Sequence, residues 1–325
     1  MLSFLVLLAL AFGFLNGFHD AANSIATVVS TRVLRPHQAV AWAAGFNLLA
    51  LALLQTGVAA TIGTGLVDPA AIDSAAIFGA LVAAILWNLL TLRLGIPTSS
   101  SHALIAGLAG ATMASAGPQA LLLPGLGLFL LFLLLAPLLG LLLGAGLMVA
   151  VLHLFSSVDA RKAERRLRQL QLVSSAVYSL GHGSNDGQKT LGIIWLLLLG
   201  AGQAAADAPP TWAAVASYLA IAAGTLFGGW RIVRTMGQRL IKLTPAGGFC
   251  AEAMGAGTIH LATWFGAPIS TTQVLTASIV GVGAVNRMNS VRWGVARVIL
   301  WSWAITLPAA ALLGALACLA AKAVG

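Results

Sequence analysis

MLSFLVLLALAFGFLNGFHDAAN, residues 1–23, runs from a nearly unbroken apolar segment directly into His19, Asp20 and Asn23. A helix needs about 20 apolar residues to cross a bilayer, and this segment is long enough to begin such a span. A cleaved signal peptide would carry a positive N-terminal region and a cleavage site of small residues, and the segment has neither. We therefore expect a retained first membrane helix that carries polar side chains at membrane depth.

The rest of the chain has the same character. Of its 325 residues, 59% are hydrophobic and 8% are charged, and the mean hydropathy is +0.97. Soluble domains carry about 25% charged residues, so this composition excludes an ordinary soluble protein. The sequence predicts an all-α fold, a polytopic transmembrane helical bundle of about ten to twelve helical segments without β-structure, because lipid tolerates only helices and closed barrels.

The net charge of +9 follows membrane topology. Cytoplasmic loops of membrane proteins are enriched in Lys and Arg, so we expect the basic segments to be cytoplasmic and expect no nucleic-acid partner. The two cysteines lack disulfide or metal-ligand spacing, and we expect no metal site and no cofactor. The basic segments are 32–35, 159–171, 231–242 and 287–297, whereas 57–73 and 200–211, expected as loops, contain no Lys or Arg.

Two motifs occur once in each half of the chain. GFHD (17–20) matches GSND (183–186) at an offset of 166 residues, and GIPTSSSHALIAGLAG (95–110) matches GAPISTTQVLTASIVG (266–281) at an offset of 171. The same order at nearly the same offset favours duplication over chance. We divide the chain into a first transmembrane repeat, a basic cytoplasmic linker and a second transmembrane repeat, at 1–155, 156–171 and 172–325.

The charge pattern orients the two repeats in opposite directions. Segment 1–31 ends at basic residues, whereas its counterpart 172–199 begins after them. Segment 97–115 ends in an uncharged loop, whereas its counterpart 268–286 ends at Arg287. Inverted-topology repeats build many secondary transporters, whose substrate site lies near the midplane between the halves.

We therefore expect an inverted-topology repeat with broken helices and re-entrant hairpins. The short segments that begin at Pro97 and Pro268 have the length of one hairpin arm rather than of a full span. Residues 121–155 are too many for one upright span, and Pro137 offers a place for that helix to break.

Asp20 and Asp186 occupy equivalent places in the two halves. An intramembrane carboxylate costs about 2.5–3.5 kcal/mol on insertion scales and is retained mainly for function. Neighbouring glycines can let a helix unwind, and carboxylate, amide and carbonyl oxygens together hold small hard cations. The alternative is a buried ion pair between each Asp and a neighbouring His or Lys. The predicted coupling-ion or proton site consists of Asp20, Asn23, Asp186, Lys189 and His102.

PTSSSH (97–102) and PISTTQ (268–273) have the pattern of helix starts that bind anions. Proline favours the first helical turn, and Ser and Thr supply capping oxygens and hydroxyl donors. Free N–H groups and the helix dipole attract an oxyanion to such an end. The alternative is a pair of ordinary capped helices. The predicted phosphate-binding set consists of Ser99, Ser100, Ser101, Ser270, Thr271, Thr272, Asn185 and Gln273.

Other polar residues carry less specific signals. His102 is a candidate donor or proton acceptor. His19 and His182 lie within the motifs but at non-equivalent positions. One interpretation is therefore that one of them serves only in packing. Glu252 and His260 allow two interpretations, a pair within a hairpin or a proton relay through Glu252.

The four motifs together resemble the inorganic phosphate transporter (PiT) family, particularly its bacterial low-affinity branch. The resemblance rests on NGFHDAANSIATVVSTRVL, GHGSNDGQKTLGIIW, PTSSSH and PISTTQ, and it covers nearly the whole chain. It implies a symporter of inverted repeats that binds phosphate at the hairpin tips and its coupling cation at the broken helices. It also implies that Asp20, Asn23, Asn185 and Asp186 belong to the coupling-ion and phosphate site.

One departure from the family pattern concerns the coupling ion. Sodium-coupled members typically read G-A-N-D-x-A-N in both halves, whereas Lys189 stands here where Asn23 stands in the first half. One hypothesis is that the ammonium of Lys189 replaces a bound sodium ion, which makes protons the coupling ion. The alternative is an ion pair between Lys189 and Asp186, three residues earlier on the same helix face. Bacterial relatives are expected to carry phosphate as a neutral metal complex, so a divalent metal could accompany the anion.

The predicted function is proton-driven import of inorganic phosphate across the cytoplasmic membrane by alternating access. Sodium coupling and a sulfate permease of the same fold are the alternatives within transport, and the proton of hydrogen phosphate favours phosphate because the buried carboxylates can accept it. An intramembrane hydrolase with Ser100 as nucleophile is disfavoured because the whole polar set is duplicated, and we expect no enzyme activity. The expected partners are phosphate, a coupling cation and membrane lipids, and the sequence is compatible with a homodimer.

Overall fold

The computed structural model describes residues 1–53, 55–286 and 288–324, so Arg287, used above to orient the second hairpin, lies outside the described residues. The described residues are almost entirely helical, and their β-structure is limited to one isolated bridge between Val67 and Leu121. The elements are α1 (Leu2–Ser30), α2 (Pro36–Leu49), η1 (Ala50–Leu53), α3 (Gly57–Ala60), η2 (Thr61–Gly65), α4 (Ser74–Leu94), α5 (Ser100–Ala116), η3 (Pro118–Ala120), α6 (Leu123–Leu154), α7 (Ala160–Gly200), α8 (Thr211–Phe227), α9 (Trp230–Arg234), η4 (Thr235–Arg239), α10 (Pro245–Trp264), α11 (Thr271–Asn286), η5 (Met288–Ser290) and α12 (Trp293–Val324).

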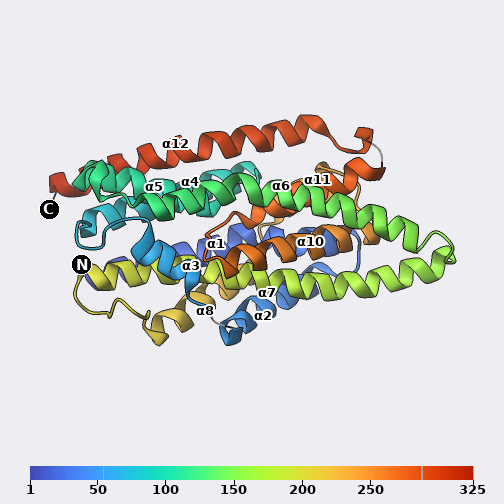
Figure 1. The fold of residues 1–325 in the computed structure, drawn as a ribbon, viewed down its shortest axis with the longest axis horizontal. Coiled ribbons are helices and arrows are strands. Elements are labelled where there is room, and N and C mark those ends of the chain that lie inside the picture. Colours follow the sequence, from blue (N-terminus) through green and yellow to red (C-terminus); the bar gives the residue numbers. More distant parts are fainter. Residues whose placement is uncertain (54, 287, 325) are drawn as a thin grey trace.

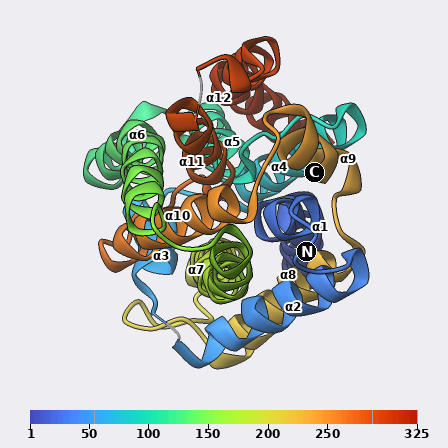
Figure 2. The ribbon, with the colours of Figure 1, turned by 90° about the vertical axis from the view of Figure 1, so that its right-hand side faces the viewer.

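The long helices lie side by side along one axis and form an elongated bundle (Figure 1). Among the described residues, α1, α4, α6 and α12 are long and apolar enough to cross a membrane, and two bent pairs raise the number to six if each pair is one span. The protein is therefore a multi-pass membrane protein. Seen along the bundle, α1 and α7 occupy the interior, with α2 and α8 on one side and the remaining long helices around them (Figure 2).

The bent pairs are the broken helices of this fold. Residues 36–53 and 57–65 meet at 81°, and residues 211–227 and 230–239 meet at 61°. Each pair ends in a π-helical turn, η2 or η4. The segment 57–73, expected as a loop, is thus helical over 57–65.

The breaks do not occur at the glycines of the GFHD and GSND motifs, where the sequence predicted unwinding. Helices α1 and α7 continue through Gly17 and Gly183. A Cβ on Gly17 would lie 2.2 Å from the carbonyl oxygen of Ile221, and a Cβ on Gly183 would lie 2.6 Å from the backbone of Asn47. These glycines therefore permit close contact between α1 and α8 and between α7 and α2, and the prediction of local unwinding was wrong.

One further boundary differs from expectation. Helix α6 is a single helix of 32 residues with Pro137 inside it, so the expected break is absent. In a membrane, neighbouring helices and local adjustments compensate for a proline inside a helix. The basic segment 160–171 is helical and forms the first part of α7, and both the division of the chain at 156–171 and the cytoplasmic location of this segment stay predictions.

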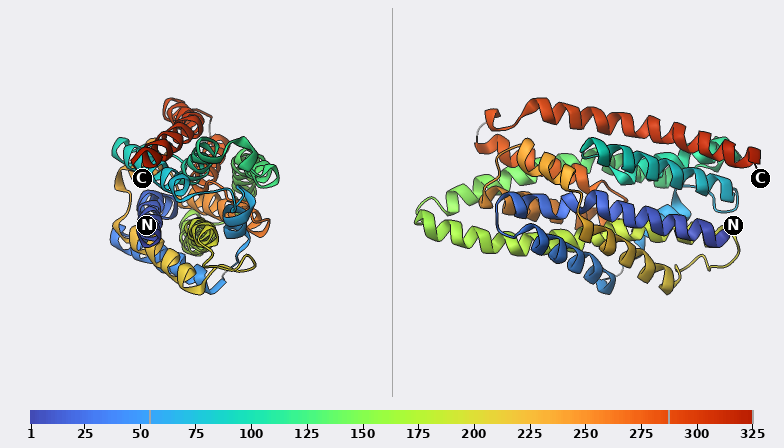
Figure 3. Two further views of the ribbon diagram at one scale, coloured as in Figure 1. Left: turned by 90° about the vertical axis from the view of Figure 1, so that its left-hand side faces the viewer. Right: turned by 180° about the vertical axis from the view of Figure 1, so that it is seen from behind.

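The order of elements is the same in the two halves. Each half begins with a long helix, which a bent pair and a helical hairpin follow, and ends with a long helix that contains a proline. This order runs first from α1 to α6 and again from α7 to α12. Helices α1 and α6 run away from the end of the bundle at which the N-terminus lies, whereas α7 and α12 run toward it (Figures 1 and 3). Opposite directions of equivalent helices are what an inverted repeat requires, and the repeat itself stays a prediction.

Each hairpin has a tip at which the first arm ends in a glycine with positive φ. Gly95 after α4 and Gly266 after α10 both have φ of 68°, in the left-handed region that glycine adopts without strain. Thr235 Oγ1 of η4 donates a hydrogen bond to Gly95 O at 2.8 Å, and Thr61 Oγ1 of η2 donates one to Gly266 O at 2.7 Å. We call these the two tip hydrogen bonds, and each joins the bent pair of one half to the hairpin of the other half.

Candidate functional site

The polar residues of all four motifs meet at one buried place, where α1 and α7 contact the N-terminal ends of α5 and α11. Two apolar core clusters lie along the bundle, one rich in residues of α4, α5 and the second half of α7, the other rich in residues of α10, α11 and η4. Each of the thirteen predicted site residues is at most 4% exposed. The site is thus closed to both ends of the bundle in this conformation.

The two helix starts are built alike, as the sequence predicted. Ser99 caps α5 by accepting a hydrogen bond from His102 N at 3.1 Å, and Ser270 accepts one from Gln273 N at 3.2 Å at the start of α11. The capping hydroxyls are therefore occupied by the backbone. The following residues, among them Ser100 and Thr272, point their hydroxyls at other side chains.

Asp20 is the acceptor at which both helix starts converge. Ser100 Oγ of α5 donates to Asp20 Oδ2 at 2.8 Å, and Thr272 Oγ1 of α11 donates to Asp20 Oδ1 at 3.4 Å. One helical turn along α1, Asn23 Nδ2 donates to Thr271 Oγ1 at 3.2 Å and to Thr272 Oγ1 at 2.9 Å. A single carboxylate thus holds hydroxyl groups from both halves of the chain.

Asp186 is neutralised by Lys189. Lys189 Nζ lies 2.6 Å from Asp186 Oδ1, which confirms the ion pair that the sequence offered as one interpretation of this lysine. The same ammonium donates to Ile269 O at 2.7 Å and to Ser101 Oγ, and Ser101 Oγ donates to Ile269 O at 2.9 Å. Both members of the pair are fully buried, and a buried charge pair is stable only when its remaining hydrogen-bonding groups are satisfied, as they are here.

Both motif histidines lie beside a carboxylate, and the interpretation of one of them as a packing residue alone stays a prediction. His19 Nδ1 lies 2.6 Å from Asp20 Oδ1 and His19 Nε2 lies 3.1 Å from Thr91 Oγ1. His182 Nε2 lies 3.4 Å from Asp186 Oδ2. In each half, an imidazole thus lies beside the intramembrane carboxylate.

Three of these groups could together hold a cation. One ligand atom each from Asp20, His182 and Asp186 lies within 4.8 Å of the others. The sequence predicted no metal site. His182 and Asp186 lie four residues apart on α7, but the third member, Asp20, comes from α1, and no local spacing relates it to the other two. Alignment of the two GFHD-type motifs was the available signal, since it sets Asp20 against Asp186.

Three predicted residues make other contacts. Asn185 Nδ2 donates to Thr263 Oγ1 at 3.0 Å and to Ala267 O at 3.2 Å, so this side chain supports the second hairpin. His102 Nδ1 and Gln273 Nε2 lie 3.4 Å apart, and both line an apolar groove between α6 and α12. The hydrogen bonds of the described residues do not join these two side chains to Asp20 or Asp186.

The structure adds residues that the sequence did not single out. Asn16 Nδ2 lies 3.4 Å from Asp186 Oδ2, and Tyr178 donates from its hydroxyl to Thr271 O at 3.0 Å.

Glu252 accepts hydrogen bonds from α1 and α7, whereas His260 is exposed and contacts Val177 O. The suggested pair of Glu252 and His260 is therefore wrong, because the two side chains leave α10 toward different neighbours.

Comparison with known proteins gives one consistent result. The model of a family described as the phosphate transporter family matches residues 16–314. A protein of Rhizobium meliloti (strain 1021) named a probable low-affinity inorganic phosphate transporter is 50% identical over 321 residues, which are 98% of this chain and 96% of the relative. A protein of Bacillus subtilis (strain 168) with the same name is 44% identical over 96% of this chain and 95% of its own length. A solved structure named "The sodium-dependent phosphate transporter" aligns with 100% of this chain and 99% of its own, with a TM-score of 0.90 at 23% identity, so the two share a fold.

Proposed function

This chain belongs to the phosphate transporter family, and on that premise we propose that it is a secondary active symporter that imports inorganic phosphate across the cytoplasmic membrane. Protons drive the import, and the protein works by alternating access. Phosphate is held at the N-terminal ends of α5 and α11. The donors there are the hydroxyls of Ser100, Ser101, Thr271 and Thr272 and the free N–H groups of two helix starts, which favour an anion.

One observation carries this proposal. The hydroxyls of Ser100 and Thr272, which phosphate would need, donate to the carboxylate of Asp20. A proton on Asp20 removes the negative charge that repels phosphate and weakens the hold of Asp20 on both hydroxyls, because a neutral carboxyl is a poorer acceptor than a carboxylate. Proton binding and phosphate binding then favour each other, which is the thermodynamic requirement for symport.

Lys189 supports protons over sodium as the coupling ion. Its ammonium contacts Asp186, Ser101 and Ile269 O, which are oxygen ligands of the kind that a small cation would use. A tethered cation at this place leaves no equivalent position for a sodium ion in the second half. The similar solved structure is named for its sodium dependence, but a likeness at 23% identity concerns the fold alone.

A divalent cation that travels with phosphate has a candidate place. Asp20, His182 and Asp186 offer one nitrogen and two carboxylate oxygens within 4.8 Å of one another, beside the hydroxyls assigned to phosphate. Such a cation is cargo here rather than a resident cofactor, and it would offset the charge of the anion in a site that is closed to water.

The two tip hydrogen bonds support alternating access. The Thr235–Gly95 bond joins the first hairpin to η4, which lies in the basic segment 231–242, and the Thr61–Gly266 bond joins the second hairpin to η2, which lies in the segment 57–73 without Lys or Arg. Because each bond links one half to the other, breaking one bond frees one hairpin tip while the other stays attached. The closed site would then open toward one end at a time.

The experiment is uptake of radiolabelled phosphate into proteoliposomes under an imposed pH gradient or sodium gradient. We expect uptake under the pH gradient, little competition by excess sulfate, loss of uptake in Asp20→Asn and at least a tenfold decrease in Ser100→Ala. Ser157→Ala, at an exposed serine after α6, is the matched control and should transport normally. Uptake driven by sodium would refute proton coupling, and transport of sulfate instead of phosphate would refute the substrate.

A further inference from the structure

Glu252 is a buried carboxylate that the phosphate site does not use. It lies in α10, is 1% exposed, and accepts hydrogen bonds from Thr27 Oγ1 of α1, from Ser174 Oγ at 2.6 Å and from Gln171 Nε2 at 3.5 Å, both of α7. All three donors are uncharged, and the ion pairs among the described residues do not include Glu252. A lone carboxylate at this depth needs a reason to be there.

The titratable groups around Glu252 leave it without a compensating cation. On α7 these groups are Tyr178 and, toward the central site, His182 and Asp186; on α1 they are His19 and Asp20. The two nearest cations of α7 are paired with other carboxylates, Lys189 with Asp186 and Arg168 with Glu164. Helix α11 has no charged residue, and α6 has only His153, which is exposed near the end of that helix. On α10 itself, Cys250 is buried and His260 is exposed on another side.

Polar side chains spaced by one helical turn mark two routes between Glu252 and the central site, one on α1 and one on α7. Thr27 is one helical turn from Asn23, which donates to Thr271 and Thr272. Ser174 is one turn from Tyr178, whose hydroxyl donates to Thr271 O at 3.0 Å. Both routes reach the start of α11, where Thr272 contacts Asp20.

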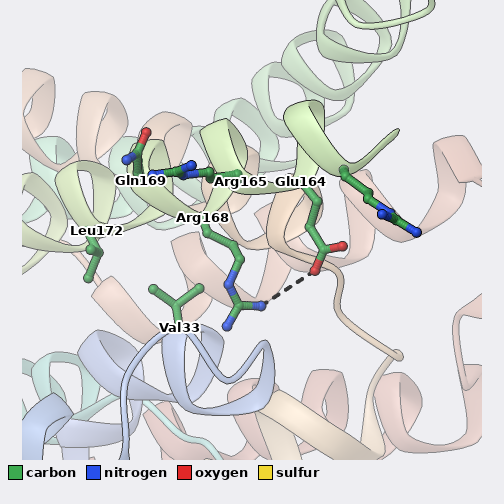
Figure 4. Close-up of a pocket in the computed structure, with 7 residues that line it drawn as sticks. Val33, Glu164, Arg165, Arg168, Gln169 and Leu172 are labelled. Atoms are coloured by element: carbon green, nitrogen blue, oxygen red, sulfur yellow. Dashed lines mark ion pairs between the residues drawn. The ribbon is translucent and has the colours of Figure 1, made fainter. Parts of the chain in front are cut away.

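Polar side chains also connect Glu252 with the basic end of the bundle. Thr31 Oγ1 donates to Gln171 Oε1 at 2.9 Å, and Arg168 donates to the carbonyl oxygens of Thr31 at 3.3 Å and Arg32 at 2.5 Å. Arg168 lines an open hollow of about 390 Å³ at the start of α7, where it pairs with Glu164 (Figure 4). We call Thr27, Thr31, Gln171, Ser174 and Glu252 the polar path.

The equivalent place in the other half is apolar. With the offset of 166 residues between α1 and α7, Thr27 and Thr31 correspond to Ile193 and Leu197, and Gln171 and Ser174 correspond to Leu5 and Leu8. With the offset of 171 between α4 and α10, Glu252 corresponds to Leu81. Four of these five are buried members of one apolar cluster, and Leu8 packs against it. Equivalent helices thus form a polar junction toward the basic end and a hydrophobic one toward the opposite end.

We propose that Glu252 accepts the coupling proton from the central site and passes it to water at the basic end. The proposal rests on proton-coupled transport as proposed above. The proton leaves the carboxyl group of Asp20, binds the carboxylate of Glu252 and is then released to water in the hollow beside Arg168. The apolar counterpart gives a proton no such route toward the other end, so the polar path makes proton release one-sided.

Two transport modes of the same proteoliposomes separate this role from phosphate binding. Net uptake under an inward pH gradient requires the proton to be released on the far side, whereas exchange of labelled for unlabelled phosphate at equal pH does not. Glu252→Gln keeps the size and hydrogen-bonding capacity of the side chain but cannot release a proton. We expect it to decrease net uptake at least tenfold and to keep exchange within twofold of the unsubstituted protein.

Two further variants complete the test. Glu252→Asp keeps a titratable carboxyl and should retain net uptake well above that of Glu252→Gln, which also makes the test independent of the folding of a single variant. Asp207→Asn, an exposed carboxylate in the loop before α8, should leave both modes unchanged.

The possible results discriminate between the two proposals. Full net uptake by Glu252→Gln, or loss of exchange together with net uptake in both Glu252 variants, would overturn the role of Glu252. An unsubstituted protein driven by sodium and not by a pH gradient would overturn proton coupling and the polar path with it. A proton-driven unsubstituted protein with an unaffected Glu252→Gln variant would overturn the polar path alone.

Discussion

Removal of one tip hydrogen bond should loosen one hairpin and leave the other in place. Thr235→Val deletes the hydroxyl that donates to Gly95 O, and Thr61→Val deletes the one that donates to Gly266 O, with little change in side-chain volume. Each threonine also donates to the carbonyl four residues earlier in its own helix. The valine variants lose this second donation as well, but between the two halves each variant loses only its tip hydrogen bond.

The size of the effect follows from the energy of one hydrogen bond. A typical intramolecular hydrogen bond contributes about 1 kcal/mol net, and 1.4 kcal/mol corresponds to a factor of about ten in an equilibrium constant. Each substitution should therefore raise the population in which its hairpin tip is open by roughly fivefold.

Hydrogen exchange at the hairpin tips measures this population directly, because exchange of protected amides follows local opening. The protected amides are equivalent in the two hairpins. Gly95 and Ile96 donate to Leu92 O and Thr91 O, and Gly266 and Ala267 donate to Thr263 O and Ala262 O. Thr235→Val should speed exchange about fivefold in peptides that contain residues 95–96 and leave residues 266–267 unchanged, and Thr61→Val should do the reverse. Unchanged exchange in both variants, or faster exchange at both tips in each variant, would refute the role of these bonds.

Three further results are expected. Gly17→Ala should lower stability by about 1–3 kcal/mol because its Cβ would meet a backbone carbonyl of α8, whereas Gly45→Ala, with open space around it, should not; equal melting temperatures would contradict the close-contact role. Lys189→Asn should make phosphate uptake dependent on sodium, and uptake that stays proton-driven and indifferent to sodium would count against replacement of a bound ion by the ammonium. In a background without the native cysteines, Ser174→Cys should react with a membrane-impermeant thiol reagent from the basic end during transport, while Leu8→Cys should stay protected from both ends; equal labelling would argue against a one-sided polar path.

Much of the architecture could be predicted from local sequence. The apolar composition determined the class, and the duplicated PTSSSH and PISTTQ segments marked the starts of α5 and α11 because proline and hydroxyl side chains favour a helix N-terminus irrespective of the surrounding fold. The duplication also indicated a site between the two halves, whereas the contacts of both helix starts with Asp20 are tertiary and no motif encodes them. At these two helix starts, the residues that favour a helix N-terminus locally are also the residues that the buried site contains.

The failures have a common physical cause. Gly17 and Gly183 permit unwinding by their conformational freedom, but the structure uses their lack of a side chain for close helix contacts, and the two uses cannot be distinguished without knowing the neighbouring helix. Pro137 does not break α6, because neighbouring helices can compensate for a proline inside a membrane helix. Glu252 pairs with hydroxyls and an amide from α1 and α7, contacts between segments at least 78 residues apart that no spacing motif encodes.

The central claim is that each phosphate enters together with protons. Its most direct test is to record the internal pH of proteoliposomes that contain a pH-sensitive dye, with no pH gradient imposed, when phosphate is added outside in sodium-free buffer. We expect phosphate-dependent acidification of the interior by the unsubstituted protein and no acidification by Asp20→Asn. Phosphate uptake without acidification, or acidification that requires sodium, would contradict it.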